Sequence, residues 1–433
     1  MKEVKPQMWE DVLKQLKGVS VANESELGVS DILTSVQDSL SNIVSYEAAD
    51  KPQIKVSNLT REHLRKVLTV FMGSGAYRED GTEYLTPYTH QGTGTVNTLV
   101  LSLLSIIADI KENVIYNEDP KLLELLLIDR TKTTNEDVHN IMWATDNYAP
   151  MGQGYQEWDE INIERITGEN GMLLRPRVNK SKAEQEYRSR DKAEVFTPAW
   201  ICNKQNNLID AAWFSGTSPF NIENDDNTWE SATGKIPFPT PDGKTWQDYV
   251  KDTRLEMACG EAPYLVSRYG VVSGMDIPIK ERIGILDRKL RVVSENVDNV
   301  REWIKWATIA YQNTYGFEWQ GDNLLLAREA MLYTFFDYYK EKFGKTPAQL
   351  QGEKIAEIIS WNLWQMDGLK GVIPGSCYEE VQEEFNLIGE SKKTITKCTG
   401  CEKGDITKHN GIYCILKDWE KGKTVRFIDL LNK

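Results

Sequence analysis

The sequence lacks an apolar run long enough to cross a bilayer. Its longest one, residues 98–110 (TLVLSLLSIIADI), falls short of the roughly 20 residues that a membrane-spanning helix needs, and we expect a buried helix there. No basic segment followed by an apolar one opens the chain as a secretion signal would. We therefore expect a cytoplasmic protein with no membrane partner.

Positive charge is also scarce. The chain carries 51 Lys and Arg against 65 Asp and Glu, a formal net charge of −14. Phosphate binding needs basic side chains, so this balance argues against a surface that coats nucleic acid indiscriminately. One local basic cluster remains at residues 175–192 (RPRVNKSKAEQEYRSRDK). A contact with DNA phosphates and an ordinary solvated face are both compatible with it.

Cysteine is sparse, with six in 433 residues, and reduced thiols are expected without an export signal. Four ligand-type residues nevertheless gather near the C-terminus in the spacing C-x2-C-x7-H-x4-C: Cys398, Cys401, His409 and Cys414. Two cysteines two residues apart bind one side of a tetrahedral ion, and a histidine and a third cysteine complete it. The pattern predicts a zinc site; the alternative is ordinary buried cysteines on a hairpin.

Hydrophobic residues make up 40% of the 433 residues, which is enough for two or three globular domains. The N-terminal part has helical periodicity at residues 30–44 and 60–72, followed by a turn-rich stretch at 73–95 and an apolar helix at 96–110. Beyond Pro120 the pattern changes to mixed strands and loops.

Residues 87–116 (PYTHQGTGTVNTLVLSLLSIIADIKENVIY) resemble the late part of the ABC-type ATPase domain in the overcoming-lysogenization-defect (OLD) family of ATP-dependent nucleases. The resemblance covers about residues 50–118. It implies that residues 91–94 (QGTG) open a helix toward a phosphate and that Glu118 and Asp119 follow a Walker B strand. No G-x-x-x-x-G-K-(S/T) phosphate loop is present, so we expect no ATP hydrolysis. A scaffold or relic and a nucleotide contact in trans remain the alternatives.

A glycine-cornered turn stands in the middle of the chain, in residues 255–264 (LEMACGEAPY). Its small residues predict a strand end followed by a helix whose N–H groups approach a cofactor. The final EAPY also resembles a worn copy of the (Asp/Asn/Ser)-Pro-Pro-aromatic tetrapeptide that holds an amino group for methylation. The preceding residues are too polar for the strand that such a tetrapeptide follows, so we favour the cofactor turn. A merely structural turn is the third alternative.

From about residue 121 the chain resembles restriction endonuclease subunit M, a DNA N6-adenine methyltransferase-like group. Besides the turn, the resemblance rests on residues 194–201 (EVFTPAWI), 315–329 (YGFEWQGDNLLLARE) and 357–374 (EIISWNLWQMDGLKGVIP). It implies a Rossmann-like α/β fold and S-adenosyl-L-methionine (AdoMet) as cofactor. The implied cofactor-binding residues are Phe196, Thr197, Pro198, Glu256, Ala258, Cys259, Gly260 and Glu318.

The resemblance also implies roles for the Phe-Thr-Pro element and for the two acids. The Phe-Thr-Pro element packs at the methionine end of AdoMet, and Glu256 accepts from its ammonium group. Glu318 accepts from the ribose hydroxyls, with Asp322 as the alternative acid.

Three departures from the family stand out. Ala262 replaces a second glycine, and the interval from Gly260 to Glu318 is long enough to require an inserted helical element. No two prolines are adjacent anywhere, so the family's catalytic tetrapeptide is missing and no catalytic residue is assigned.

We thus predict an α-rich ATPase-like fragment (residues 1–118), an AdoMet-binding Rossmann-like domain (119–376) and a small C-terminal Cys/His region (377–433). The predicted function is that of an AdoMet-dependent DNA (adenine-N6) methyltransferase-like subunit of a restriction-modification or phage-defence system. DNA and restriction or specificity subunits are the expected partners. The alternative is a catalytically inactive AdoMet- and DNA-binding subunit, or a fused remnant.

Overall fold

The computed structural model describes the backbone of three strands between residues 53 and 87. It further describes residues 120–431, apart from residues 172, 181, 193, 217 and 386–390. The chain divides into two compact units, Met1–Val114 and Ile115–Lys433. Each unit is described by itself.

The described part of the first unit is an antiparallel sheet in the order β1-β2-β3. Its strands are β1 (Gln53–Val56), β2 (Leu68–Tyr77) and β3 (Glu83–Pro87). The predicted helix over residues 60–72 is therefore wrong from Leu68 onward. The sequence LTVF is rich in β-branched and aromatic residues that favour strands, and a short apolar run does not distinguish helix from strand by periodicity. The predicted elements at 30–44, 96–110 and 113–116 lie outside the described residues.

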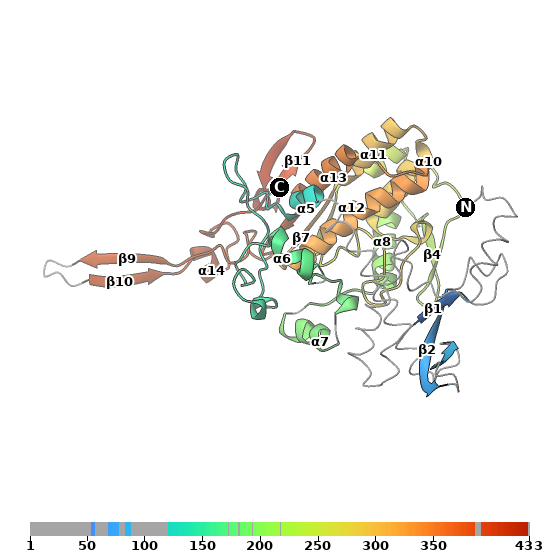
Figure 1. Ribbon diagram of the computed structural model, residues 1–433. Coiled ribbons are helices and arrows are strands. Elements are labelled where there is room, and N and C mark those ends of the chain that lie inside the picture. The colour runs from blue at the N-terminus through green and yellow to red at the C-terminus, as the bar shows by residue number, and fades with distance from the viewer. Residues whose placement is uncertain are drawn as a thin grey trace. The chain divides into compact units, whose positions relative to one another are not determined.

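The second unit contains a parallel three-stranded sheet in the order β6-β7-β8. Its central strand, β7, is labelled in Figure 1. The strands are β6 (Arg254–Met257), β7 (Thr314–Glu318) and β8 (Leu363–Gln365). Parallel strands require long crossovers, and helices supply both of them. The helices α10 (Ile285–Asn296) and α11 (Val300–Gln312) connect β6 to β7, which confirms the predicted inserted helical element. The helices α12 (Gly321–Phe343) and α13 (Gln349–Asn362) connect β7 to β8.

Helix α12 forms the centre of the unit. Its buried residues lie on all sides of the first four turns, as expected for a helix enclosed by neighbours. It contacts β7 and β8 as well as α10 and α13. Gly344, in the left-handed conformation (φ 67°), ends it. The main core gathers leucines and aromatic residues of these helices, with Trp303, Tyr311 and Phe335 completely buried.

The remaining helices flank this core. They are α5 (Pro120–Leu127), α6 (Ile163–Ile166), α7 (Lys182–Asp191), α8 (Ala199–Trp213), α9 (Trp246–Lys251), α14 (Thr399–Lys403) and α15 (Ile428–Leu431). Three antiparallel pairs complete the unit: β4 (Asn221–Glu223) with β5 (Trp229–Ser231), β9 (Glu380–Phe385) with β10 (Ser391–Thr396), and β11 (Ile415–Asp418) with β12 (Lys423–Arg426).

The C-terminal residues cover part of the parallel sheet. Leu416 and Phe427 pack with Phe317 and Trp364 in a second, smaller core. This ties the end of the chain to the sheet and so to the ends of β7 and β8.

Among the helices that the structure describes, none combines the length and the apolar character needed to cross a membrane.

Candidate functional site

A cavity of about 400 Å³ lies at the carboxyl ends of β6 and β7. Ligands of open parallel sheets bind at this edge, because the loops that follow the strands diverge there. Of the eight cofactor residues that the sequence predicts, seven line this cavity: Phe196, Thr197, Glu256, Ala258, Cys259, Gly260 and Glu318. Pro198 is not among the lining residues. Three segments that are far apart in the chain therefore meet where the sequence predicts a cofactor site.

The glycine-cornered turn forms one wall of the cavity. Its backbone alternates into the left-handed region, with φ values of 50° at Ala258, 54° at Gly260 and 59° at Ala262. Only glycine adopts this region without steric cost, so the two alanines hold a strained turn. The N–H of Cys259 donates to the carbonyl of Phe317 over 2.9 Å and anchors the turn to β7. This hydrogen bond thus fixes the turn to the sheet.

Glu256 stands at the end of β6 as a buried carboxylate between two exposed apolar neighbours. Leu255 is 44% and Met257 71% exposed, whereas Glu256 is 9% exposed. Its two oxygens accept from the N–H groups of Tyr264 and Leu265, over 3.4 and 3.2 Å. Burial raises the pKa of Glu256 well above its usual value, and the charge of Glu318 adds to this, against the effect of the two N–H groups.

Glu318 ends the neighbouring strand and faces the same cavity. One oxygen accepts from the N–H of Gly260 over 2.8 Å and the other from the N–H of Gln320 over 3.2 Å. Burial raises the pKa of this carboxyl too, although the N–H of Gly260 opposes the shift. The two strand ends therefore present two buried carboxylates to one cavity, as expected from their places in neighbouring parallel strands. A cation or a pair of hydroxyl donors is the natural complement of such a pair.

The Phe-Thr-Pro element approaches the turn from the start of α8. Pro198 is the residue before the helix, with extended backbone (φ −57°, ψ 146°), and as a proline it disfavours a helical conformation of Thr197, which lines the cavity together with Phe196. The ring of Phe196 lies against Gly260, where an added Cβ would be 3.4 Å away. The guanidinium of Arg177 covers the ring at 5.2 Å from its centre. Phe196 is thus held between a cation and the turn.

Sequence reasoning missed several lining residues. Ala144 and Thr145 come from the loop after Trp143, and Trp319 and Gln320 follow Glu318 directly. The indole N–H of Trp319 donates to the carbonyl of Ala144 over 2.8 Å and joins these two walls. The only local signal was at residues 317–323 (FEWQGDN), where polar and aromatic residues surround the acid that the resemblance places at a strand end.

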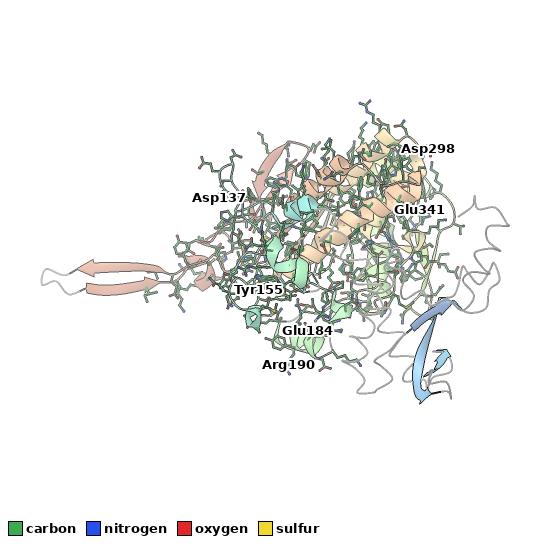
Figure 2. All side chains as sticks on the ribbon, viewed as in Figure 1. Asp137, Tyr155, Glu184, Arg190, Asp298 and Glu341 are labelled. Carbon is green, nitrogen blue, oxygen red and sulfur yellow. The ribbon has the colours of Figure 1, made fainter. Side chains whose placement is uncertain are left out.

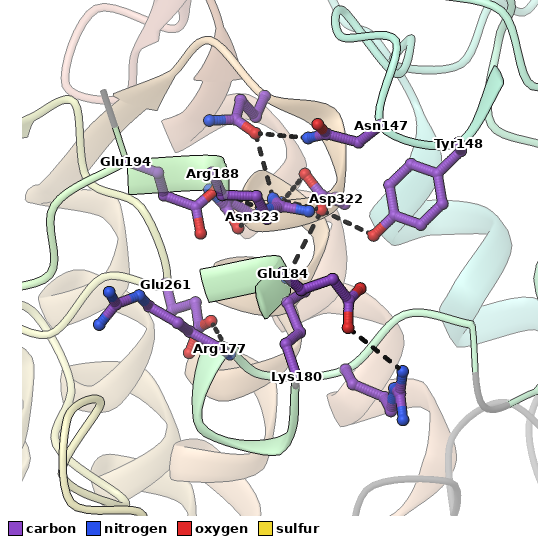
Figure 3. Close-up of polar contacts among 12 residues, drawn as sticks. Asn147, Tyr148, Arg177, Lys180, Glu184, Arg188, Glu194, Glu261, Asp322 and Asn323 are labelled. Atoms are coloured by element: carbon purple, nitrogen blue, oxygen red, sulfur yellow. Dashed lines mark hydrogen bonds and ion pairs between the residues drawn. The ribbon is translucent and has the colours of Figure 1, made fainter. Parts of the chain in front are cut away.

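A buried network of charged side chains includes Glu194, which lines the cavity (Figure 3). Arg188 lies between Glu194 and Asp322: its Nε donates to Glu194 over 2.6 Å and its Nη2 to Asp322 over 2.7 Å. The hydroxyl of Tyr148 donates to the same Asp322 oxygen over 2.8 Å, and the ammonium of Lys180 lies 3.7 Å from it. Burial alone would raise the pKa of Asp322, but the positive charges of Arg188 and Lys180 outweigh it and lower this pKa to about 2.

This network changes the interpretation of the basic cluster at residues 175–192. Arg188 and Lys180 are 3% and 5% exposed, and Lys192 pairs with Asp146. Only part of the cluster faces solvent, such as Arg190 on α7 (Figure 2). Helix α7 therefore places Arg188 in the protein interior. Fewer basic side chains of residues 175–192 reach solvent than the sequence suggests.

A second site lies near the C-terminus, where three cysteine sulfurs and one histidine nitrogen lie within 4.8 Å of one another. The residues are Cys377, Cys398, Cys401 and His409. The three sulfurs are 3.5, 3.6 and 3.6 Å from Nδ1 of the histidine. Zinc–sulfur bonds of about 2.3 Å and zinc–nitrogen bonds of about 2.0–2.1 Å at a tetrahedral angle require a separation of about 3.6 Å. The cluster is compatible with zinc.

The cluster differs from the predicted set in one ligand. Cys414 is completely buried elsewhere, with its sulfur 3.3 Å from the carbonyl of Gln365, and Cys377 completes the group instead. Cys377 and Cys398 flank the β9–β10 hairpin, whose antiparallel strands bring its two ends together. Sequence spacing favoured Cys414 because it is closer in the chain, but a hairpin makes distant residues neighbours.

The ATPase-like residues 91–94, Glu118 and Asp119 lie outside the described residues. Searches of family models, curated proteins and solved structures find no match to this chain, so its function is argued from the geometry of the two sites.

Proposed function

We propose that this chain is an AdoMet-binding, DNA (adenine-N6) methyltransferase-like subunit of a restriction-modification or phage-defence system, with a Rossmann-like core. One observation carries the proposal: seven residues predicted to bind the cofactor line a single cavity at the carboxyl ends of two neighbouring parallel strands. Its volume of about 400 Å³ falls within the range of roughly 300–1,000 Å³ that small-molecule sites occupy.

The chemistry of the cavity fits a cationic nucleoside. Glu318 has a second lone pair on each oxygen and so retains the capacity to accept from ribose hydroxyls. The rings of Phe196, Tyr264 and Trp319 line the same space and supply faces on which a purine stacks. Burial raises the pKa values of Glu256 and Glu318 because it makes their negative charge costly, and a sulfonium beside them would offset that cost.

We propose that methyl transfer requires a complex of this chain with DNA and partner subunits. Adenine N6 is a weak nucleophile, and its activation requires a flipped base held by an acceptor, a backbone carbonyl and an aromatic ring. The chain has no Pro-Pro tetrapeptide to provide this clamp. We therefore propose that the chain holds AdoMet, and that DNA and partner subunits of the same system complete the reaction. A subunit that binds AdoMet and transfers nothing is the second candidate, and the same missing tetrapeptide favours it.

Calorimetric titration of AdoMet into the purified chain tests the proposal. Binding is expected, and Glu318→Ala should weaken it by about 1–3 kcal/mol, because the ribose hydroxyls lose their acceptor. Glu302→Ala is the matched control, since Glu302 lies on the exposed side of α11 and, among the residues that the structure describes, forms a surface ion pair with Lys305. Absence of AdoMet binding by the unaltered, folded chain would overturn the proposal.

A tritium-transfer assay separates the two candidates. With labelled AdoMet and bare DNA the chain alone should transfer little or no label to adenine N6. Loss of a single pre-organised hydrogen-bonding group typically costs about 10²–10³ in rate, and here the whole clamp is absent. Robust labelling by the chain alone would contradict this and would direct attention to residues 261–264 (EAPY).

We further propose that the cluster of Cys377, Cys398, Cys401 and His409 binds structural zinc at the base of the β9–β10 hairpin. Four protein ligands close the coordination shell, as in structural rather than catalytic sites. Elemental analysis of purified protein should find one zinc per chain, retained in Cys414→Ser and lost in Cys377→Ser. The opposite pattern would show that the sequence-predicted ligand set is correct.

A further inference from the structure

One corner of the cavity is lined by polar residues that the sequence did not assign to ligand binding. These are Thr145, Lys192 and Glu194, which we call the polar corner. Thr145 and Glu194 are each only 6% exposed, although both line the cavity. Polar side chains buried this far normally have hydrogen-bond partners, because an unsatisfied buried polar group destabilises the fold.

Two atoms of the polar corner lack such a partner among the described residues. They are Oε1 of Glu194 and Oγ1 of Thr145. The other carboxylate oxygen of Glu194 accepts from Nε of Arg188, which fixes the side chain in place (Figure 3). Glu194 is thus held by one oxygen and leaves the other unsatisfied at a cavity wall. A ligand that brings a hydrogen-bond donor would satisfy it.

Backbone contacts bring the three side chains together. The N–H groups of Lys192 and Glu194 both donate to the carbonyl of Arg188, over 3.1 and 3.2 Å. The ammonium of Lys192 pairs with Asp146, the neighbour of Thr145 in the chain. The corner therefore combines a carboxylate oxygen, a hydroxyl and an ammonium group. This set complements a zwitterion, which carries both a donor cation and an anion.

We propose that the polar corner binds the α-amino-acid end of AdoMet. The ammonium group donates to Oε1 of Glu194 and to Oγ1 of Thr145, and the carboxylate faces Lys192. The sequence-based candidate for the ammonium, Glu256, accepts one N–H hydrogen bond from its own turn on each oxygen, whereas Oε1 of Glu194 accepts none among the described residues. The inference rests on the proposed AdoMet site and names the side chains that recognise one end of the cofactor.

The test compares AdoMet with 5′-methylthioadenosine, which keeps the adenosine and the sulfur but lacks the amino-acid end. Calorimetry on the full chain should show tighter binding of AdoMet. The change Glu194→Gln should weaken AdoMet binding by about 10- to 100-fold, because a charge-assisted hydrogen bond is lost, and leave methylthioadenosine binding unchanged. Thr145→Val, nearly the same shape, should lower AdoMet affinity less and in the same selective way. Glu184→Gln, on the exposed side of α7, is the matched control.

The outcomes separate this inference from the proposed function. Loss of selectivity for AdoMet in Glu194→Gln or Thr145→Val, with methylthioadenosine still bound, supports the polar corner. If Glu194→Gln loses both ligands through misfolding, the Thr145→Val result decides. Equal affinity of the unaltered chain for both ligands, or variants with unchanged AdoMet affinity, overturns the polar corner while the AdoMet site stands. An unaltered chain that binds neither ligand overturns both.

Discussion

Asp322 is the residue whose replacement tests the buried charge network most directly. Asp322→Asn keeps the shape of the side chain but removes the negative charge that faces Arg188 and Lys180. Its pKa is lowered from 3.8 to about 2, which corresponds to about 2 kcal/mol of stability at neutral pH. Removing one partner of a buried ion pair leaves the other uncompensated and typically costs about 3–5 kcal/mol. We expect Asp322→Asn to lower the free energy of unfolding by about 2–5 kcal/mol at pH 7.

The stabilising contribution of Asp322 should depend on pH. A carboxyl with a depressed pKa stabilises the folded state above its unfolded pKa, and this contribution disappears as the pH falls through the folded pKa. The contribution of Asp322 should therefore be complete above pH 5, fall to roughly half at pH 3 and nearly vanish at pH 2. The difference between the unaltered chain and Asp322→Asn should narrow over the same range.

Urea unfolding followed by tryptophan fluorescence, at pH 7 and at steps down to pH 3, measures this difference. Asp298→Asn is the control: Asp298 is 99% exposed and pairs with Lys342 at the surface (Figure 2), where an ion pair contributes little. It should leave the unfolding midpoint unchanged. If the difference in free energy of unfolding between Asp322→Asn and the unaltered chain stays constant from pH 7 to pH 3, the electrostatic argument is refuted.

Three further predictions concern the sheet and its surroundings. Gly321→Ala should lower the free energy of unfolding by about 1–3 kcal/mol and weaken AdoMet binding, because a Cβ there would lie 2.0 Å from the carbonyl oxygen of Met142 beside the cavity. Gly216→Ala is the control: an added Cβ meets open space there, so neither urea unfolding nor AdoMet titration should change. Arg328→Lys should lower the free energy of unfolding in urea by more than about 3 kcal/mol, because the guanidinium donates to four backbone carbonyls and an ammonium group cannot reach all of them. A smaller decrease would contradict the stabilising role of these hydrogen bonds. Burial lowers the pKa of Lys289 to about 7, so stability should rise between pH 7 and about 10 as the folded state releases this proton first, and the dependence should be absent in Lys289→Met.

The sequence allowed much of the cavity to be predicted. The turn at 255–264 follows a local rule, because small residues mark a strand end. The Phe-Thr-Pro element and the acid at 318 were predicted from the resemblance to the methyltransferase family, and Pro198 adds only that the residue before it stays extended. Once two strands are parallel neighbours, their carboxyl ends share an edge. The residues that follow them therefore meet, whatever the length of the helical insertion between them.

Tertiary structure decided what local pattern could not. Cys377 joins Cys398 because a hairpin brings its two ends together, and no spacing rule reveals that contact. Arg188, patterned like a surface residue, is buried because Glu194 and Asp322 compensate its charge from other segments. By itself, then, the sequence determined which residues follow the strand ends. Only the packing of distant segments decided which polar groups are buried and paired and which remain open to a ligand, because burial and ion pairing depend on neighbours that the chain order does not specify.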